Sequence, residues 1–274
     1  MEFVEVRPGI VTAVLEPEQV NVTVVAGGSR CLLVDTGSSP AQGAEIRETA
    51  GRAVGVPLET VVVSHGHWDH AFGLSAFADL NSVGHENLEQ DLHCEENVRW
   101  ATDQQIDLGS LALPTTQLVT IGVRDLGGMT AEIAHFGPAH SRSDLIIAVP
   151  QCSTLIVGDL VEEAGPQFDE TTCLDGWVKA LDALYGLLTE STLVIPGHGA
   201  PLGPVEVTRF RAGLAAIWDQ SEWAFRQGVP EDQAYDHDEL EWPWDRTTVE
   251  QGIRLAYAEL AVRPEPVQPP MSLW

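Results

Sequence analysis

Basic residues are scarce in this chain: 14 Lys and Arg stand against 41 Asp and Glu among its 274 residues, and the formal net charge is −27 at pH 7. Such an acidic surface repels phosphate backbones and anionic lipid headgroups, so we expect no nucleic-acid partner and no membrane partner. No apolar run approaches the length needed to cross a bilayer. The opening stretch MEFVEVRPGIV also lacks the basic start and apolar core of a signal peptide.

Cysteine is scarce too, with four residues and no CxxC pair. Scattered cysteines are typical of reduced thiols, so we expect a cytoplasmic protein and not a disulfide-framed secreted one. Linkers rich in glycine and serine, low-complexity blocks and short repeats are absent as well. We therefore predict one domain over residues 1–262, followed by a proline-rich tail over 263–274.

The residues that are present favour a mixed α/β chain with a sizeable core, since 44% of them are hydrophobic. Alternating β-branched residues between turns predict antiparallel hairpins over 5–17 and 19–39. Helical spacing with capping residues predicts helices over 38–55, 86–105, 174–188, 204–228 and 247–261. Short apolar runs predict strands over 60–63, 130–136, 144–150, 153–159 and 192–195, the third and fourth forming a hairpin.

The motif HGHWDH at 65–70 places three of the nine histidines and one aspartate directly after a predicted strand. Three other predicted strands end in short turns that carry a possible metal ligand, namely His140 in GPAH, Asp159 in VGDL and His198 in PGHG. Loops at strand ends are where a rigid sheet presents chemistry. We therefore expect these four turns to meet at one edge.

The types of side chain in these turns indicate a metal site. Imidazoles and carboxylates without cysteine suit zinc, and manganese or iron as alternatives. Five histidines and two aspartates are too many for one tetrahedral ion but suit two ions that share a bridge. The motif would then direct His65 and His67 to one ion, and Asp69 and His70 to the other.

With these four motifs, and LLVDTG at 32–37, the chain resembles the metallo-β-lactamase superfamily over residues 20–205. The resemblance implies an α+β fold, a four-layer αββα sandwich with a two-metal site at one edge. It implies that one ion takes His65, His67 and His140, that the other takes Asp69, His70 and His198, and that Asp159 bridges them. It also implies that Asp35 steadies the HGHWDH loop by hydrogen bonds.

The implied activity is hydrolysis of a small ester, thioester, lactone or amide by a hydroxide that bridges the two metal ions. The leaving group would be neutralised by a metal ion or by a proton from Asp69 or water, which makes Asp69 the catalytic candidate. Asp159 stands where the main antibiotic-hydrolysing branch has cysteine, so the chain resembles the glyoxalase II and lactonase branches instead. An alternative is a mononuclear iron enzyme that oxidises persulfides. A flavodiiron-like scaffold ranks last, because no flavin or rubredoxin-type partner domain is evident.

The neighbours of the motifs receive weaker assignments. Trp68 is interpreted as a wall of the substrate pocket, because it lies inside the motif. Arg142 and Ser143 are equally compatible with binding a substrate anion and with capping the next strand. His135 is interpreted as a core or supporting residue. The loops over 162–173 and 238–245 either border the cleft or serve as solvated connections.

Overall fold

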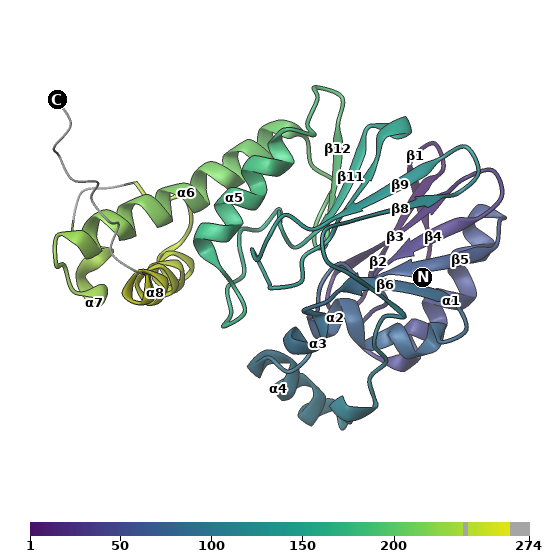
Figure 1. Cartoon of the computed structure of the whole chain (residues 1–274), viewed down its shortest axis with the longest axis horizontal. Coiled ribbons are helices and arrows are strands. Elements are labelled where there is room, and N and C mark those ends of the chain that lie inside the picture. The colour runs from purple at the N-terminus through teal and green to yellow at the C-terminus, as the bar shows by residue number, and fades with distance from the viewer. Residues whose placement is uncertain (238–240, 264–274) are drawn as a thin grey trace, which may run out of the picture.

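Two β-sheets lie face to face in the computed structural model, which describes residues 1–237 and 241–263 (Figure 1). The larger sheet has the order β1-β2-β3-β4-β5-β6-β7 and the smaller one β12-β11-β10-β9-β8. The strands of the larger sheet are β1 Val4–Arg7, β2 Ile10–Leu15, β3 Val20–Ala26, β4 Cys31–Val34, β5 Leu58–Val62, β6 Asn81–His85 and β7 Thr116–Leu118. Those of the smaller sheet are β8 Ile121–Asp125, β9 Thr130–Ala134, β10 Ile146–Val149, β11 Thr154–Gly158 and β12 Leu193–Pro196.

Helices cover the outer face of each sheet. The α-helices are α1 Pro40–Val54, α2 Trp68–Ala71, α3 Leu88–Asp91, α4 Glu95–Gln104, α5 Leu174–Tyr185, α6 Pro204–Arg226, α7 Glu231–Ala234 and α8 Arg246–Val262. Short 3₁₀ turns are η1 Phe72–Phe77, η2 Leu108–Ser110 and η3 Pro150–Cys152. In Figure 1 the helices α1 to α4 lie beside the larger sheet, and α5 to α8 extend from the smaller one.

Three separate apolar cores account for the layers. The core between the sheets joins residues such as Val34 and Val62 of the larger sheet to Ile147 of the smaller one. A second core packs α1 and η1 on the larger sheet, and a third packs α5, α6 and α8 on the smaller sheet around the fully buried Trp177. Each sheet is buried on both faces, on one by the other sheet and on the other by helices, and this gives four layers. The predicted four-layer αββα sandwich is therefore confirmed.

Local sequence explains where several of these elements begin. The Ser39 hydroxyl accepts a hydrogen bond from the backbone N–H of Gln42, with Pro40 in the first helical turn, so α1 begins where capping chemistry predicts. The 86–105 region is helical as predicted but divides into α3 and α4, because Cys94 starts a new helix by accepting from the N–H of Asn97. The hairpin of β10 and β11 is confirmed by their antiparallel pairing.

Strands β6, β7 and β8 were not anticipated from the sequence. β6 reads NSVGH and β7 is three residues long, so neither carries a run of β-branched residues. β6 and β7 are held by the parallel pairing of β5 with β6 and of β6 with β7, and β8 is held by antiparallel pairing with β9. Because β4 to β7 are parallel, their carboxyl ends point to the same edge of the sheet.

The C-terminal region is described only in part. The expected tail over 263–274 lies outside the described residues except for Arg263, as do residues 238–240 of the loop over 238–245. Within the described residues, none of the helices combines the length and the apolar character that crossing a membrane requires. The single domain over 1–262 stays a prediction.

Candidate metal centre

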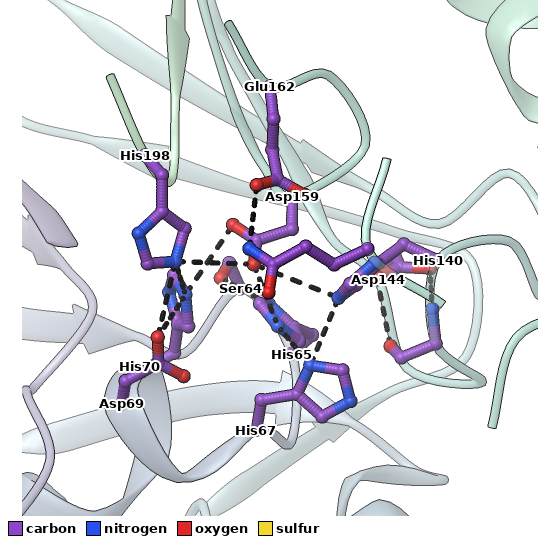
Figure 2. Close-up of polar contacts among 12 residues, drawn as sticks. Ser64, His65, His67, Asp69, His70, His140, Asp144, Asp159, Glu162 and His198 are labelled. Atoms are coloured by element: carbon purple, nitrogen blue, oxygen red, sulfur yellow. Dashed lines mark hydrogen bonds and ion pairs between the residues drawn. The ribbon is translucent and has the colours of Figure 1, made fainter. Parts of the chain in front are cut away.

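All seven predicted ligands meet at one edge of the two sheets, where the loops after β5, β9, β11 and β12 converge (Figure 2). The motif loop leaves β5 at Val62, and His67 is the cap residue of the short helix α2. That turn places His65 and His67 before the helix, and Asp69 and His70 on it. Residues that are far apart in sequence are thus brought together by strand order.

The first group consists of three histidines and one aspartate, all buried: His65, His67, His140 and Asp159. Its ring nitrogens converge: His67 Nδ1 lies 3.1 Å from His65 Nε2 and 3.0 Å from His140 Nε2. Zinc–nitrogen bonds of about 2.0–2.1 Å in a tetrahedral site place two ligand nitrogens about 3.3 Å apart. The observed separations are close to that value.

The second group consists of Asp69, His70 and His198. The Nε2 atoms of His70 and His198 lie 3.4 Å apart, and Asp69 Oδ2 lies 3.2 Å from His198 Nε2. Asp69 Oδ2 is also 3.6 Å from His70 Nε2. These three atoms form a triangle of the size that one cation would fill.

Asp159 contacts both groups. Its Oδ2 lies 3.7 Å from the Nε2 atoms of His65 and His140, and its Oδ1 lies 3.5 Å from His70 Nε2. Oδ1 is buried and accepts no hydrogen bond. Gly197 permits this approach, because a Cβ atom there would lie 1.9 Å from Asp159 Oδ1. The Asp159 carboxylate therefore stands between the two groups, where a bridging ligand would lie.

The ring nitrogens that face away from the site have their own partners. His67 Nε2 lies 3.0 Å from Asp169 Oδ2, His65 Nδ1 lies 3.0 Å from the Ser64 hydroxyl, and His198 Nδ1 lies 3.2 Å from the Glu18 carbonyl. Metal-binding histidines almost always donate their second N–H in this way. Among the five rings, only His140 lacks such a partner, because its buried Nδ1 neither donates nor accepts a hydrogen bond.

Asp35 ties the motif loop to β4. Its carboxylate accepts from the backbone N–H of Ser64 at 2.7 Å, from the Ser64 hydroxyl at 2.9 Å and from His70 Nδ1 at 2.9 Å. The residue is 1% exposed and adopts a φ of +69°, a left-handed conformation that aspartate tolerates better than most residues. The expected hydrogen bonds from Asp35 to the HGHWDH loop are thus present.

Neighbouring carboxylates raise the pKa of some rings of the site, while burial and neighbouring rings lower the pKa of others. Burial lowers the pKa of His67, but the hydrogen bond and charge of Asp169 outweigh it and raise that pKa to about 9. Burial likewise opposes protonation of His198, yet the charge of Asp159 raises its pKa to about 10. Burial and the neighbouring His67 lower the pKa of His140 to about 4. The site therefore attracts positive charge, and protons compete with cations for the same nitrogens.

Metal ions fit these residues better than hydrogen bonds alone. The Ser64 hydroxyl donates to Asp35, so it accepts from His65 Nδ1–H and leaves a lone pair on His65 Nε2. His67 Nε2–H points at Asp169, so His67 Nδ1 carries a lone pair as well. In the neutral rings these lone pairs face each other at 3.1 Å, so either a proton on His67 Nδ1 or a cation has to lie between them, and only a cation would bind His65, His67 and His140 together.

A cavity opens onto the site. Its volume is about 230 Å³. The lining includes candidate ligands together with Glu18, Trp68, Glu96, Gln167, Phe168 and Asp169. Trp68 lines it as predicted, and its ring also stacks on Trp100 with centroids 3.7 Å apart.

Arg142 and Ser143 take structural roles. Arg142 Nη1 lies 3.1 Å from Asp91 Oδ1, and the Ser143 hydroxyl donates to Asp91 Oδ2 at 2.6 Å and accepts from Gly66 N–H at 3.1 Å. Arg142 thus fastens the turn after His140 to α3, Ser143 fastens it to α3 and to the motif loop, and neither residue lines the cavity.

The other histidines stay outside the cavity. His135 stacks on the buried His85 with centroids 3.8 Å apart, and its Nδ1 lies 2.9 Å from the Asp144 carbonyl, which agrees with a supporting role. His93 and His237 are exposed.

Sequence reasoning missed Asp169. The loop over 162–173 was left open between two roles, and the structure places it along the cavity, where Asp169 supports His67. Two hydrogen bonds from Thr171 to Asp169 Oδ1 fix its carboxylate. Cys94 also lies near His67 and Asp169, but the His67 nitrogen on that side is already hydrogen-bonded to Asp169. No local pattern in the sequence marks Asp169.

Comparison with known proteins agrees with this geometry. A model of the metallo-beta-lactamase superfamily matches residues 15–209, more than half of the chain. A linear primary-alkylsulfatase from a Pseudomonas species is 22% identical over 254 residues, covering 74% of this chain and 46% of the relative. The chain thus spans about half the length of that curated relative.

Solved structures share the fold. A metallo-beta-lactamase from Pontibacter korlensis has 18% identity and a TM-score of 0.64, over 78% of this chain and 98% of its own. The inverting sec-alkylsulfatase Pisa1 from a Pseudomonas species has 16% identity and a TM-score of 0.77, over 94% of this chain and 50% of its own. With the family model matching most of the chain and its motifs gathered at one edge, the chain belongs to the metallo-β-lactamase superfamily.

Proposed function

We propose that this protein is a dinuclear metal-dependent hydrolase that acts on a small ester, thioester, lactone or amide. The observation that carries the proposal is the position of Asp159, whose two carboxylate oxygens contact the two groups of candidate ligands. A single tetrahedral ion would leave several of the seven candidate ligands without a role. We also propose that the protein works in the cytoplasm on a small-molecule substrate.

The proposed ligand assignment follows the two groups. One ion would be held by the three histidines of the first group, which are His65, His67 and His140. The other would be held by Asp69, His70 and His198, and Asp159 would be shared by both. Zinc is our preferred metal, because the set is nitrogen and oxygen without sulfur, and manganese or iron would also accept it.

Two divalent ions in this position would lower the pKa of a shared water to about 7 and polarise the oxygen of the scissile group. The chain contributes the rest. His67, His70 and His198 keep their metal-facing nitrogens unprotonated only when the ions displace protons from them, so binding is expected to strengthen as pH rises. Asp69, which lines the cavity, is our candidate to hold the proton that neutralises the leaving group.

Alkyl sulfates enter as a second substrate class, since two of the similar proteins are named alkylsulfatases. The cavity lining argues against them, because the described residues around it include five carboxylates and neither lysine nor arginine. A sulfate ester would bring a negative charge into that environment. We therefore rank carboxylic esters and thioesters ahead of sulfate esters.

The test combines metal content with hydrolysis. The zinc-loaded protein is offered p-nitrophenyl acetate, a thioester, a γ-lactone, an anilide and p-nitrophenyl sulfate. We expect two zinc ions per chain and turnover of at least one acyl substrate, with a loss of at least a hundredfold in His67→Ala. His93→Ala, at an exposed histidine away from the cavity, is the matched control. A fully loaded protein that hydrolyses none of the acyl compounds would overturn the proposal.

The same preparation separates the redox alternative. One iron per chain, with oxygen uptake on a glutathione persulfide, would support an iron oxygenase and refute the dinuclear hydrolase. Two zinc ions and no oxygen uptake would refute the oxygenase.

A further inference from the structure

We propose that the substrate carries a cationic ammonium group on the part that lies at the mouth of the cavity, where Glu18 and Glu96 recognise it. This inference rests on the proposed hydrolase function and deepens it by naming a substrate class. It concerns the residues that line the cavity beyond the seven candidate ligands.

The charges around the cavity are unbalanced. Five carboxylates line it, and none of the lining residues in the described part of the chain is a lysine or arginine. Asp69 and Asp159 are assigned to the ions, and Asp169 accepts from His67 at 3.0 Å. Glu18 and Glu96 have no cationic partner in the cavity. Two carboxylates beside an apolar wall favour a positive ligand group and disfavour a negative one.

The two glutamates also offer free hydrogen-bond acceptors. Glu18 Oε2 is buried from solvent and accepts no hydrogen bond. A buried carboxylate oxygen without a donor is costly, and a ligand that brings an N–H or a cation would remove that cost. Glu96 accepts one hydrogen bond, from the indole N–H of Trp68 at 3.3 Å, and its other oxygen is free for a ligand.

Aromatic rings complete the environment. Trp68 and Phe168 line the same cavity. Trp68 is held by its stack on Trp100 and by its hydrogen bond to Glu96, so the ring and the carboxylate are fixed side by side. Rings next to carboxylates bind alkylammonium groups through cation–π attraction and direct charge pairing. The acyl carbon would then lie at the metal centre while the ammonium group faces the glutamates.

The experiment uses three thioesters that differ in charge and little in shape. Acetylthiocholine carries a trimethylammonium group, S-(3,3-dimethylbutyl) thioacetate is its neutral analogue, and S-(2-sulfonatoethyl) thioacetate is anionic. Thiol release by the zinc-loaded full chain gives kcat/KM for each. We expect the cationic compound to exceed the neutral one by at least tenfold, and the anionic one to be the poorest. Equal values, or a preference for the anion, would overturn the inference while leaving the hydrolase in place.

Variants assign the preference to named residues. Glu18→Gln and Glu96→Gln should each lower kcat/KM for acetylthiocholine, through KM, at least threefold more than they lower it for the neutral thioester. Glu95→Gln is the matched control, because Glu95 is exposed on the same helix turn and does not line the cavity. A change of equal size for all three thioesters would contradict recognition of charge by these glutamates.

Binding without turnover separates this inference from the proposed function. Tetramethylammonium binding to the zinc-loaded protein, measured by isothermal titration calorimetry, should weaken at least tenfold in the double variant Glu18→Gln and Glu96→Gln. If no thioester is hydrolysed but this difference is found, the hydrolase fails and the cation site stands. If tetramethylammonium binds equally to the wild type and the double variant, or to neither, the cation site fails.

Discussion

Replacing Asp35 by asparagine should weaken the proposed metal site that contains His70 more than the site that contains His65. The carboxylate accepts from Ser64 N–H at one oxygen, and from the Ser64 hydroxyl and His70 Nδ1 at the other. Asparagine has one acceptor and one donor. With its oxygen facing the Ser64 N–H, its NH₂ group faces His70 Nδ1, which must then become an acceptor. The proton moves to His70 Nε2, the nitrogen that the proposed ion requires.

The size of the effect follows from that exchange of protons. Loss of a partner behind a metal-binding histidine costs about 10-fold to 100-fold in metal affinity, or about 1.4–2.8 kcal/mol. Asparagine keeps the volume and tolerates the left-handed backbone at Asp35, which has a φ of +69°, so the change isolates hydrogen bonding. We expect zinc titration by calorimetry to show the site with His70 weakened by that factor, and the site with His65, which Asp35 supports only through Ser64, weakened less.

Asp107→Asn is the control, since Asp107 caps an exposed 3₁₀ turn by accepting from Gly109 N–H. Two zinc sites of wild-type affinity in Asp35→Asn would refute the reasoning. Loss of both sites together, with unfolding, would show that Asp35 supports the loop as a whole and not His70 specifically.

Three further predictions concern other parts of the molecule. Asp169→Ala leaves His67 Nε2–H without its acceptor, so zinc affinity should fall about tenfold or more by calorimetry. Gly197→Ala places a Cβ atom 1.9 Å from Asp159 Oδ1, and elemental analysis should find less than two zinc ions per chain. In the folded chain, burial and the neighbouring His135 lower the pKa of His85 to about 4, whereas this pKa is about 6.5 in the unfolded chain. Lowering the pH therefore favours unfolding. Between pH 8 and pH 5 this protonation lowers the free energy of unfolding by about 2 kcal/mol. Urea unfolding of His85→Gln should not show that loss.

Each of these predictions has a control and a contradicting result. Asp175→Ala changes an aspartate that pairs with Lys179 and does not line the cavity, so it should leave zinc affinity unchanged; a drop as large as in Asp169→Ala would contradict the assigned role. Two tightly bound zinc ions in Gly197→Ala would mean that the loop can move away from Asp159. The control for His85→Gln is His93→Gln at an exposed histidine, and equal pH dependence of wild type and His85→Gln would contradict the burial argument.

The sequence predicts that these side chains gather at one edge because they are tied to strand ends. His65 to His70 follow one apolar run, and His140, Asp159 and His198 each follow another. Strand-end placement is local information, and the order of the four motifs then limits the possible arrangements. The same holds for α1 and the hairpin of β10 and β11, where capping residues and β-branched runs are explicit.

What the sequence leaves open depends on contacts between distant segments. β6 and β7 owe their strand conformation to parallel neighbours and not to their own residues. Asp169 lies in an irregular loop whose position is set by Thr171 and by the turn that carries His140. The role of Arg142 was undecidable from the sequence, because its partner Asp91 lies 51 residues away. The unpaired carboxylates of the cavity likewise become visible only once the loops are placed.

A crystal grown with excess zinc, measured with anomalous scattering at the zinc edge, is the most direct test of the dinuclear site. We expect two peaks about 3.5–4 Å apart. One should contact the histidines of the first group, the other the second group, and Asp159 should touch both. A single peak, or side chains of His140, Asp159 and His198 turned away from the metal, would contradict it.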